Sequence, residues 1–373
     1  MPETSTHSLE DRIAEQLAQL DQTHALRVLP ELGEGIDFVS NDYLSLSQTE
    51  YSERGLSAGS TGSRLLSGNH QEVQELEEFL ATTFVAQTAT FFPNGYMANL
   101  GLLGCIAERH DTLILDQHCH ASLIDGSRMS LARSFKFEHN SCEDLETKLQ
   151  NAEGCKIVVV ESVYSMDGSE APLDDILSIC EKYNANLIID DAHSCGVDGN
   201  RGLGAGVERL AHPNVIAVTS AFGKAAGSHG AAIFGGKTIK SLLVNKSRPF
   251  IFSTAPSPSH CIVVQNQILS LKHAREARKT LRKVVSEFKT LADQSEMDWL
   301  MSNTWIQSLL VAGNENVMAL ANHLRDHNIN ALPIRHPSVA KGEERIRFTL
   351  HAHNSAEDVK HLFKTLESWH SPS

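Results

Sequence analysis

The sequence predicts an α/β fold with a mostly parallel sheet, and three observations support this. Short β-rich segments alternate with helix-like segments between residues 72 and 235. Several of these β-rich segments are continuous apolar runs, as expected for strands that crossover helices cover on both faces. After about residue 258 the pattern changes to a long helical stretch followed by interleaved strands and helices. We therefore expect a large domain with its sheet sandwiched by helices, and a smaller C-terminal α+β domain.

The first segment of the chain carries Leu9, Ile13, Leu17 and Leu20 at helical spacing, which predicts an amphipathic docking helix. Acidic residues stand where an export signal would carry positive charge, so we do not interpret it as a signal peptide. Six β-rich runs follow, at 88–92, 112–116, 156–162, 186–191, 214–220 and 231–235. Helix-like stretches such as 72–84 and 173–183 lie between most of them.

The C-terminal part begins with "VVQNQILSLKHAREARKTLRKVVSEFKTLA", which predicts a long helical stretch. The strand-like runs "WIQSLLVAG", "INALPI" and "RIRFTLH" follow it. We expect an N-terminal arm over residues 1–40, a large domain over 41–257 and a small domain over 258–373. The arm is expected to join the small domain in space.

Composition excludes several classes of function. The 46 acidic residues outnumber the 32 basic ones, and the net charge of -14 argues against nonspecific nucleic-acid binding. No apolar run is long enough to span a membrane. The seven cysteines are scattered and never spaced as C-x-x-C, which favours reduced thiols in a cytoplasmic protein.

Lys224 lies in a run of small residues, "TSAFGKAAGSHGAA", that leaves its amine a clear path to a bulky group. It could be a phosphate ligand, a covalent nucleophile or a solvated charge. A Walker A loop is excluded because Val218 and Ala225 stand where that loop needs Gly and Ser or Thr. The run "GLGAG" at 202–206 lacks the spacing of a dinucleotide-binding loop.

The segment "DQHCHASL" carries His118, Cys119 and His120, all of which are competent metal ligands. We expect this segment to be a strand, on which 118 and 120 share one face and 119 points away, so the three side chains cannot converge. We therefore expect no metal site. His120 is interpreted as a residue for stacking or proton transfer, with a hydrogen-bonded core histidine as the alternative.

Other polar groups follow predicted strands, at the edge where open α/β sheets bind ligands. "NLIIDDAHSCG" supplies Asp190 and His193, although its aspartates could simply cap the next turn. "FFPNGYMANL" turns from a strand into a helix whose N-terminus can hold an anion. With Lys224 and His120, these groups match the requirements of pyridoxal 5′-phosphate (PLP) chemistry: an amine, an acid for the ring nitrogen, a stacking ring and amides for a phosphate.

The sequence resembles the α-oxoamine synthases, PLP-dependent enzymes of fold type I, over nearly its whole length. The resemblance rests on a collinear set of motifs: "HALR", "SNDYLSLS", "GSTGSRLLSGNH", "FFPNGYMANLG", "DQHCHASLIDG", "VESVYSMDGSEAPL", "IIDDAHSCG", "FGKAAG", "RPFIFSTAPSP" and "RIRFTL". It is nearest to the biotin-pathway branch, which implies L-alanine and a pimeloyl thioester as substrates. Glycine acetyltransferase, 5-aminolevulinate synthase, serine palmitoyltransferase, quorum-signal synthases and a non-catalytic partner subunit are the alternatives.

The resemblance also implies roles for individual residues. Lys224 is the covalent anchor and base, His120 stacks on the ring, and Asp190 faces its nitrogen. The other implied cofactor contacts are Gly95 and Tyr96 around the phosphate, His193 and Ser165 around the phenolic oxygen, Glu161 beneath the site, and Ser253 and Thr254 reaching the phosphate from the partner subunit. Arg347 pairs with the substrate carboxylate. Arg27, Asn41 and Ser338 align with substrate-side positions.

Two further expectations follow from the resemblance. The roles of Ser253 and Thr254 imply a homodimer, and the acyl carrier is either acyl-carrier protein or coenzyme A. The sequence departs from the family at Ala221, where a Thr usually binds the phosphate. Either a neighbouring hydroxyl replaces it, or phosphate binding is weaker by about 1.5–3 kcal/mol.

Overall fold

The computed structural model describes residues 9–29, 34–49 and 56–369. The chain divides into two compact units. The large unit comprises residues 41–282 and 351–353, and the small unit comprises 1–40, 283–350 and 354–373. The division falls at residue 282 rather than at the predicted position 257, one helix further along the chain.

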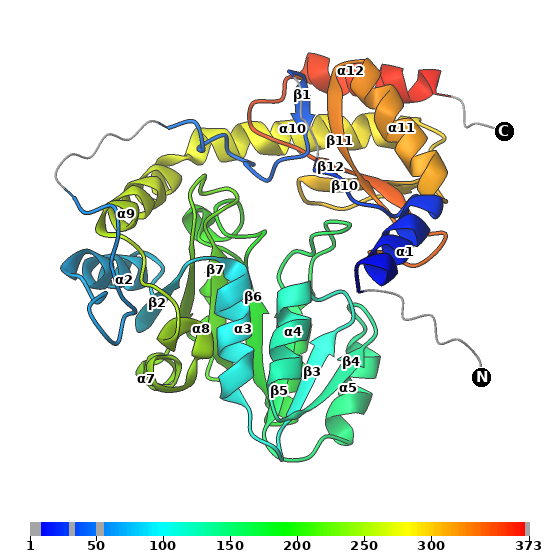
Figure 1. Cartoon of the computed structure of the whole chain (residues 1–373). Coiled ribbons are helices and arrows are strands. Elements are labelled where there is room, and N and C mark those ends of the chain that lie inside the picture. Colours follow the sequence, from blue (N-terminus) through cyan, green and yellow to red (C-terminus); the bar gives the residue numbers. More distant parts are fainter. Residues whose placement is uncertain (1–8, 30–33, 50–55, 370–373) are drawn as a thin grey trace. The chain divides into compact units, whose positions relative to one another are not determined.

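The large unit contains a seven-stranded sheet with the order β2-β8-β7-β6-β5-β3-β4 (Figure 1). Its strands are β2 (Thr88–Phe92), β3 (Thr112–Asp116), β4 (Arg133–Phe137), β5 (Lys156–Glu161), β6 (Asn186–Asp190), β7 (Val215–Ala221) and β8 (Ala231–Gly235). Six of these strands run in the same direction, and β8, between β2 and β7, runs in the opposite direction. The prediction of a mostly parallel sheet is therefore confirmed.

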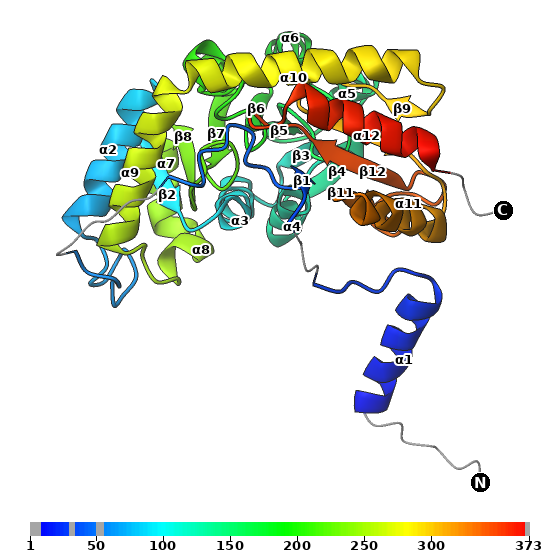
Figure 2. The ribbon, with the colours of Figure 1, turned by 90° about the horizontal axis from the view of Figure 1, so that it is seen from above.

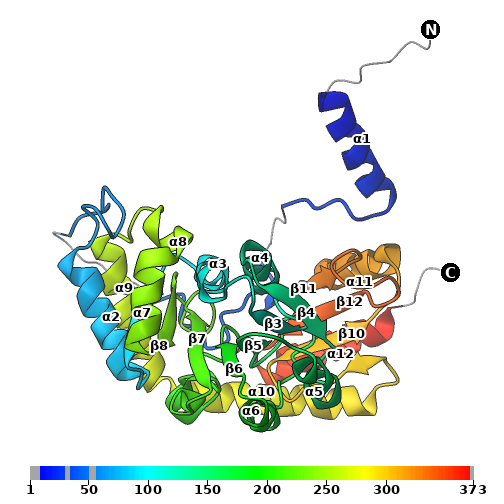
Figure 3. The same ribbon diagram turned by 90° about the horizontal axis from the view of Figure 1, so that it is seen from below.

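Helices cover both faces of this sheet. The helices are α2 (Gln71–Thr83), α3 (Gly95–Ile106), α4 (Ala121–Met129), α5 (Cys142–Gln150), α6 (Leu173–Lys182), α7 (Lys237–Lys246), α8 (Arg248–Ile251) and α9 (Pro258–His273), with 3-10 turns at Asn200–Gly202 and Val207–Arg209. Figures 2 and 3 show α3 and α4 on one face and α5 and α6 on the other. This coverage explains the continuous apolar runs: β3, for example, is buried at every position.

The small unit contains a five-stranded sheet with the order β1-β11-β12-β10-β9. Its strands are β1 (Ile36–Phe38), β9 (Trp299–Leu300), β10 (Ile306–Leu310), β11 (Ile329–Ile334) and β12 (Arg345–Thr349), and its helices are α1 (Leu9–Gln22), α11 (Asn314–Asp326) and α12 (Ala356–Ser368). β1 pairs with β11, so the N-terminal arm contributes a strand to this sheet. Phe288, Trp299 and Phe363 pack ring to ring in its core, with centroids 5.1–5.5 Å apart.

Several elements differ from the sequence prediction. The long helix is interrupted at Ala274, where α9 ends, and α10 (Arg275–Gln294) continues into the small unit. Strand β4 was missed because "RSFKF" is exposed at four of its five positions and lacks an apolar run. The four apolar side chains of α1 are 39–63% exposed, so the expected docking of this helix is absent among the described residues. No described helix has both the length and the apolarity to cross a bilayer.

Candidate active site

Five parallel strands of the large unit end at one edge of the sheet, and eight of the expected site residues follow those ends. They are Gly95 and Tyr96 after β2, His120 after β3, Glu161 and Ser165 at and after β5, Asp190 and His193 at and after β6, and Lys224 after β7. Residues remote in sequence meet here because every crossover helix returns the chain to the opposite edge.

Asp190 and Asp191 have different roles. Asp190 is buried, and its carboxylate accepts hydrogen bonds from the Ala192 amide (2.8 Å) and from Nδ2 of Asn99 (2.6 Å). The Asp191 carboxylate instead accepts the amides of Gly206 and Val207 at 2.9–3.0 Å, and burial raises its pKa to about 6. Asp190 therefore caps the turn that follows it with one carboxylate oxygen and faces helix α3 with the other, whereas Asp191 holds the loop at Gly206 and Val207.

Lys224 is half-buried in the tight loop that joins β7 to β8. Its carbonyl oxygen accepts the Gly227 amide at 2.7 Å. Gly227 has a φ of +61°, and a Cβ there would lie 2.5 Å from the backbone of Leu46 and Ser47. The small residues around Lys224 thus allow two backbone segments to pack closely, and they also leave the amine accessible.

His120 caps the N-terminus of α4, and the residue is exposed on the surface of the chain. Burial lowers the pKa of its imidazole, with the charges of Asp190 and Lys224 acting in opposite directions. The Tyr96 ring stands edge-on to it, with centroids 6.2 Å apart. The backbone amide of His120 donates to the carboxyl of Glu161, and this bond fixes the backbone position from which the imidazole ring extends.

Glu161 is the register partner of Asp190 on the neighbouring strand. Burial, followed by the negative charge of Asp190, raises the pKa of the Glu161 carboxyl well above its usual range, while the nearby charge of Lys224 lowers it. This shift favours the protonated form of the Glu161 carboxyl.

A cradle suited to a phosphate lies at the N-terminus of α3. An added Cβ on Gly95 would stand 3.2 Å from Cβ of Ala221, so the end of β7 closes directly on the first turn of the helix. Thr219 shares the strand face of Ala221, and its buried hydroxyl makes no hydrogen bond to the part of the chain that the structure describes. Asn94 already accepts the Met97 and Ala98 amides, so an anion here would meet the amides of Gly95 and Tyr96 and the Thr219 hydroxyl.

Two residues of this edge were not assigned from the sequence. Oη of Tyr43 lies 2.6 Å from Nδ1 of His193 and donates to Oδ1 of Asn41 at 3.1 Å. Tyr43 belongs to the quoted motif "SNDYLSLS", where only Asn41 received a role. The other residue is Asn99, which stands one helical turn after Gly95 and is identified by its hydrogen bond to Asp190.

The remaining expected residues lie outside this group. Arg27 donates to Oγ of Ser338 at 2.8 Å in the small unit. Arg347 is buried on β12, two residues after Arg345, whose Nε donates to the carbonyl of Glu343 at 2.9 Å. Ser253 and Thr254 follow α8 in the large unit, and their expected contact with a partner subunit remains a prediction.

The argument against a metal at His118, Cys119 and His120 assumed that these residues form a strand, but β3 ends at Asp116 and residues 117–118 form a turn. His118 stacks instead on His139, with ring centroids 4.1 Å apart, and lies 4.0 Å from Asp167. Both ring nitrogens of His139 already form hydrogen bonds, to Asp116 (2.9 Å) and Ser169 (2.8 Å). We therefore assign no metal to this group.

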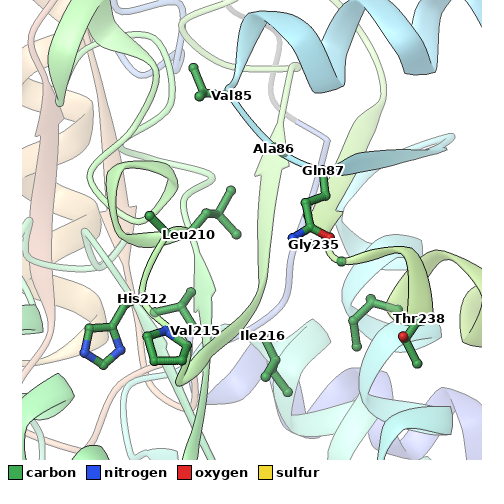
Figure 4. Close-up of a pocket in the computed structure, with 13 residues that line it drawn as sticks. Val85, Ala86, Gln87, Leu210, His212, Val215, Ile216, Gly235 and Thr238 are labelled. Carbon is green, nitrogen blue, oxygen red and sulfur yellow. The ribbon is translucent and has the colours of Figure 1, made fainter.

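A separate pocket of about 480 Å³ lies at the opposite edge of the sheet, near the start of β7 and the end of β8 (Figure 4). Val85, Leu210, Val215, Ile216 and Ile239 give it a largely apolar lining, and His212 is its one titratable side chain. It lacks the convergent polar groups found beside Lys224. We therefore place the site at the carboxyl edge of the sheet.

Comparison with known proteins agrees with this placement. The aminotransferase class I and II family matches residues 33–366. The chain is 34% identical over 339 residues to 8-amino-7-oxononanoate synthase from Marinobacter nauticus, covering 89% of this chain and 86% of that one. Among solved structures it resembles Sphingomonas wittichii serine palmitoyltransferase (TM-score 0.86, 27% identity, 97% and 98% covered). It also resembles 8-amino-7-oxononanoate synthase from Francisella tularensis (TM-score 0.74, 27% identity, 89% and 96% covered).

Proposed function

Because the chain belongs to the class I and II aminotransferase family, and within it to the α-oxoamine synthases, we propose that it makes 8-amino-7-oxononanoate for biotin synthesis. The reaction is the decarboxylative condensation of L-alanine with a pimeloyl thioester, which releases carbon dioxide and a free thiol. The chain is a PLP-dependent enzyme of fold type I.

The residues present fit this cofactor. Lys224 offers an amine, Asp190 a buried carboxylate and His120 a ring, while the cradle at Gly95 offers amides for a phosphate. The gathering of these groups at one edge of the sheet is the observation that carries the proposal. When bound, PLP accepts the electrons released at the substrate α-carbon.

The protein's own groups would hold and move the protons of this reaction. A carboxylate at Asp190 would favour the protonated form of the ring nitrogen, and the raised pKa of Glu161 favours the neutral form of that neighbouring carboxyl. The Lys224 amine would take the α-proton of the substrate as a base. Arg347 would hold the substrate carboxylate through its planar guanidinium.

Further parts of the proposal concern partners. Ser253 and Thr254 would complete the phosphate site of a second copy, which makes the enzyme a homodimer. The acyl group would arrive on acyl-carrier protein or on coenzyme A. We propose a cytoplasmic location, as the reduced cysteines suggested.

Serine palmitoyltransferase activity is a second candidate, because a solved structure of that activity covers 97% of this chain. A panel of alanine, glycine and serine against acetyl, pimeloyl and palmitoyl thioesters, followed by thiol release, separates the candidates. Alanine with a pimeloyl thioester should give the highest kcat/KM. A preference for serine with the palmitoyl thioester would contradict the proposal, and protein that stays colourless with added PLP would indicate a non-catalytic subunit.

A further inference from the structure

We propose that Asn99 and Ser122 are positioning residues that link Asp190 to His120 and hold the His120 ring as one neutral tautomer, with its proton on Nε2. A chain of hydrogen bonds carries this inference. It runs from Asp190 to Asn99 (2.6 Å), from Asn99 to Ser122 (3.0 Å) and from Ser122 to His120 (2.8 Å). Asp190, Asn99 and Ser122 are all at most 4% exposed, so water does not compete for the first two bonds, whereas the third joins buried Ser122 to the exposed His120.

The direction of the first two bonds follows from chemistry. An ionised carboxylate can only accept, so the group of Asn99 that lies 2.6 Å from Oδ2 of Asp190 is its amide nitrogen. The opposite orientation would place two oxygens at that distance. The same nitrogen has a second hydrogen, which it donates to Oγ of Ser122. Asn99 thereby uses both of its N–H groups.

The tautomer of His120 follows from Ser122. The backbone amide of Ser122 points at Nδ1 of His120 at 3.2 Å, and an amide N–H can only donate. Nδ1 must therefore accept, which leaves the proton of the neutral ring on Nε2. Oγ of Ser122 already accepts from Asn99, so its own hydrogen is available for the same lone pair of Nδ1. Each hydrogen in the chain is used once.

Protonation of Nδ1 would set its N–H against the backbone N–H of Ser122, and the Ser122 hydroxyl would have to turn from donor to acceptor. The hydrogen-bond chain thus disfavours the protonated form of His120. Burial lowers the pKa of the ring and so favours the neutral form as well. The backbone amide of His120 is held separately by Glu161. The ring is consequently fixed in orientation as well as in charge, and Nε2–H is its one proton donor.

The tautomer rests on hydrogen-bond geometry alone, whereas its consequence for turnover rests on the proposed function. Under that function the His120 ring stacks on the cofactor, and its Nε2–H is held in one orientation from which it can donate to the substrate. Asn99 and Ser122 would then act on catalysis through His120 and not by contact with substrate.

The test uses the PLP-loaded enzyme with ¹⁵N-labelled histidine, and His120→Gln identifies the His120 signals. Wild type should show a pyrrole-type Nε2 and a pyridine-type Nδ1 at neutral pH. Ser122→Ala keeps the backbone amide, so Nδ1 should stay pyridine-type, but the loss of the Oγ–H bond should shift its signal, and Ser122→Thr should restore the wild-type position. Ser127→Ala is the matched control, because Ser127 is a buried serine of the same helix whose hydroxyl donates to the Ile124 carbonyl.

Kinetics provides a second readout. Ser122→Ala and the near-isosteric Asn99→Leu should each lower kcat about tenfold, with the alanine KM changed less than about twofold. A pyrrole-type Nδ1 in wild type, or unchanged His120 signals in Ser122→Ala, would overturn the proposal. Neither result depends on which substrate the enzyme prefers, so a failed substrate panel would leave the tautomer intact. The wild-type spectrum decides the tautomer even where a variant does not fold.

Discussion

The Tyr43 hydroxyl lies 2.6 Å from Nδ1 of His193, and this buried contact ties the segment after β1 to the end of β6. Tyr43→Phe removes the bond and keeps the ring. We expect the unfolding free energy to fall by about 1–2 kcal/mol, because buried Nδ1 of His193 loses its contact with the Tyr43 hydroxyl. Urea denaturation measures this loss. Tyr183→Phe is the control, since that hydroxyl bonds Gln150 and Glu146 near the surface. Equal losses in the two variants would contradict this assignment.

Lys224→Ala should abolish turnover and the covalent fixing of PLP by borohydride. The reason is that the amine beside Asp190 and His120 is the nucleophile that the proposed function requires. Mass spectrometry of the reduced wild-type enzyme should place the added mass on the peptide that contains Lys224. Lys237→Ala, an exposed lysine in the same part of the chain, should behave as wild type. A tag on another lysine would show that the anchor is misassigned.

Glu161→Gln should alter how stability depends on pH. Burial and the Asp190 charge raise the pKa of Glu161 in the folded protein well above the value of an unfolded glutamate. Between those two pKa values the unfolded chain binds fewer protons, so stability falls as pH rises, by at most about 1.4 kcal/mol per pH unit. Gln resembles the protonated acid and removes this slope.

Denaturation at pH 5.5 and at pH 7.5 measures the effect. The wild type should lose more stability than Glu161→Gln between the two pH values. A variant that loses as much as the wild type would show that Glu161 is ionised in the folded protein.

Much of the site could be predicted from the sequence, because its residues follow apolar strands that are easily recognised. His120, Asp190 and Lys224 each stand just after such a run, and the sheet brings them to one edge. Tyr43 and Asn99 could not be assigned in this way. Tyr43 lies 150 residues before its partner His193, and Asn99 lies 91 residues before Asp190. Contacts of that range depend on the packing of whole elements, which local spacing does not encode.

The error at His118 has a different cause. Alternation along a strand was applied beyond Asp116, where the strand stops because the Asp116 carboxylate accepts the His118 and Asn140 amides. A side-chain acceptor for main-chain donors competes with strand pairing and ends it. Strand β4 was missed for a related reason, since an exposed edge strand shows no apolar run.

Ala221→Thr should change PLP affinity by less than about tenfold, or ~1.4 kcal/mol. The buried hydroxyl of Thr219, on the same strand face, is placed to supply the missing contact. Thr219→Val, which keeps the shape and removes the hydroxyl, should then weaken binding by about tenfold. Equilibrium dialysis against PLP measures both constants. A much larger gain in Ala221→Thr, with no loss in Thr219→Val, would mean that the native cradle lacks a phosphate donor.

Arg345 and Arg347 lie on the same face of β12, so strand alternation alone does not say which one binds the substrate carboxylate. Arg345 is engaged locally: its Nε donates to the carbonyl of Glu343, and its guanidinium lies 3.7 Å from that residue's carboxylate. The family resemblance selects Arg347 as the clamp. A planar guanidinium fixes the angle of a carboxylate in a way that the point charge of lysine does not.

Replacement by lysine separates the two arginines. Arg347→Lys should raise the alanine KM and also lower kcat, because a misaligned carboxylate costs transition-state stabilisation as well as binding. Arg345→Lys should be comparatively mild, since lysine can still meet Glu343. Steady-state kinetics with alanine as the varied substrate gives both parameters, and the thermal midpoint of each variant shows whether the fold is kept. If Arg345→Lys lost most of its activity with alanine while Arg347→Lys stayed near normal, the substrate carboxylate would bind Arg345 and not Arg347.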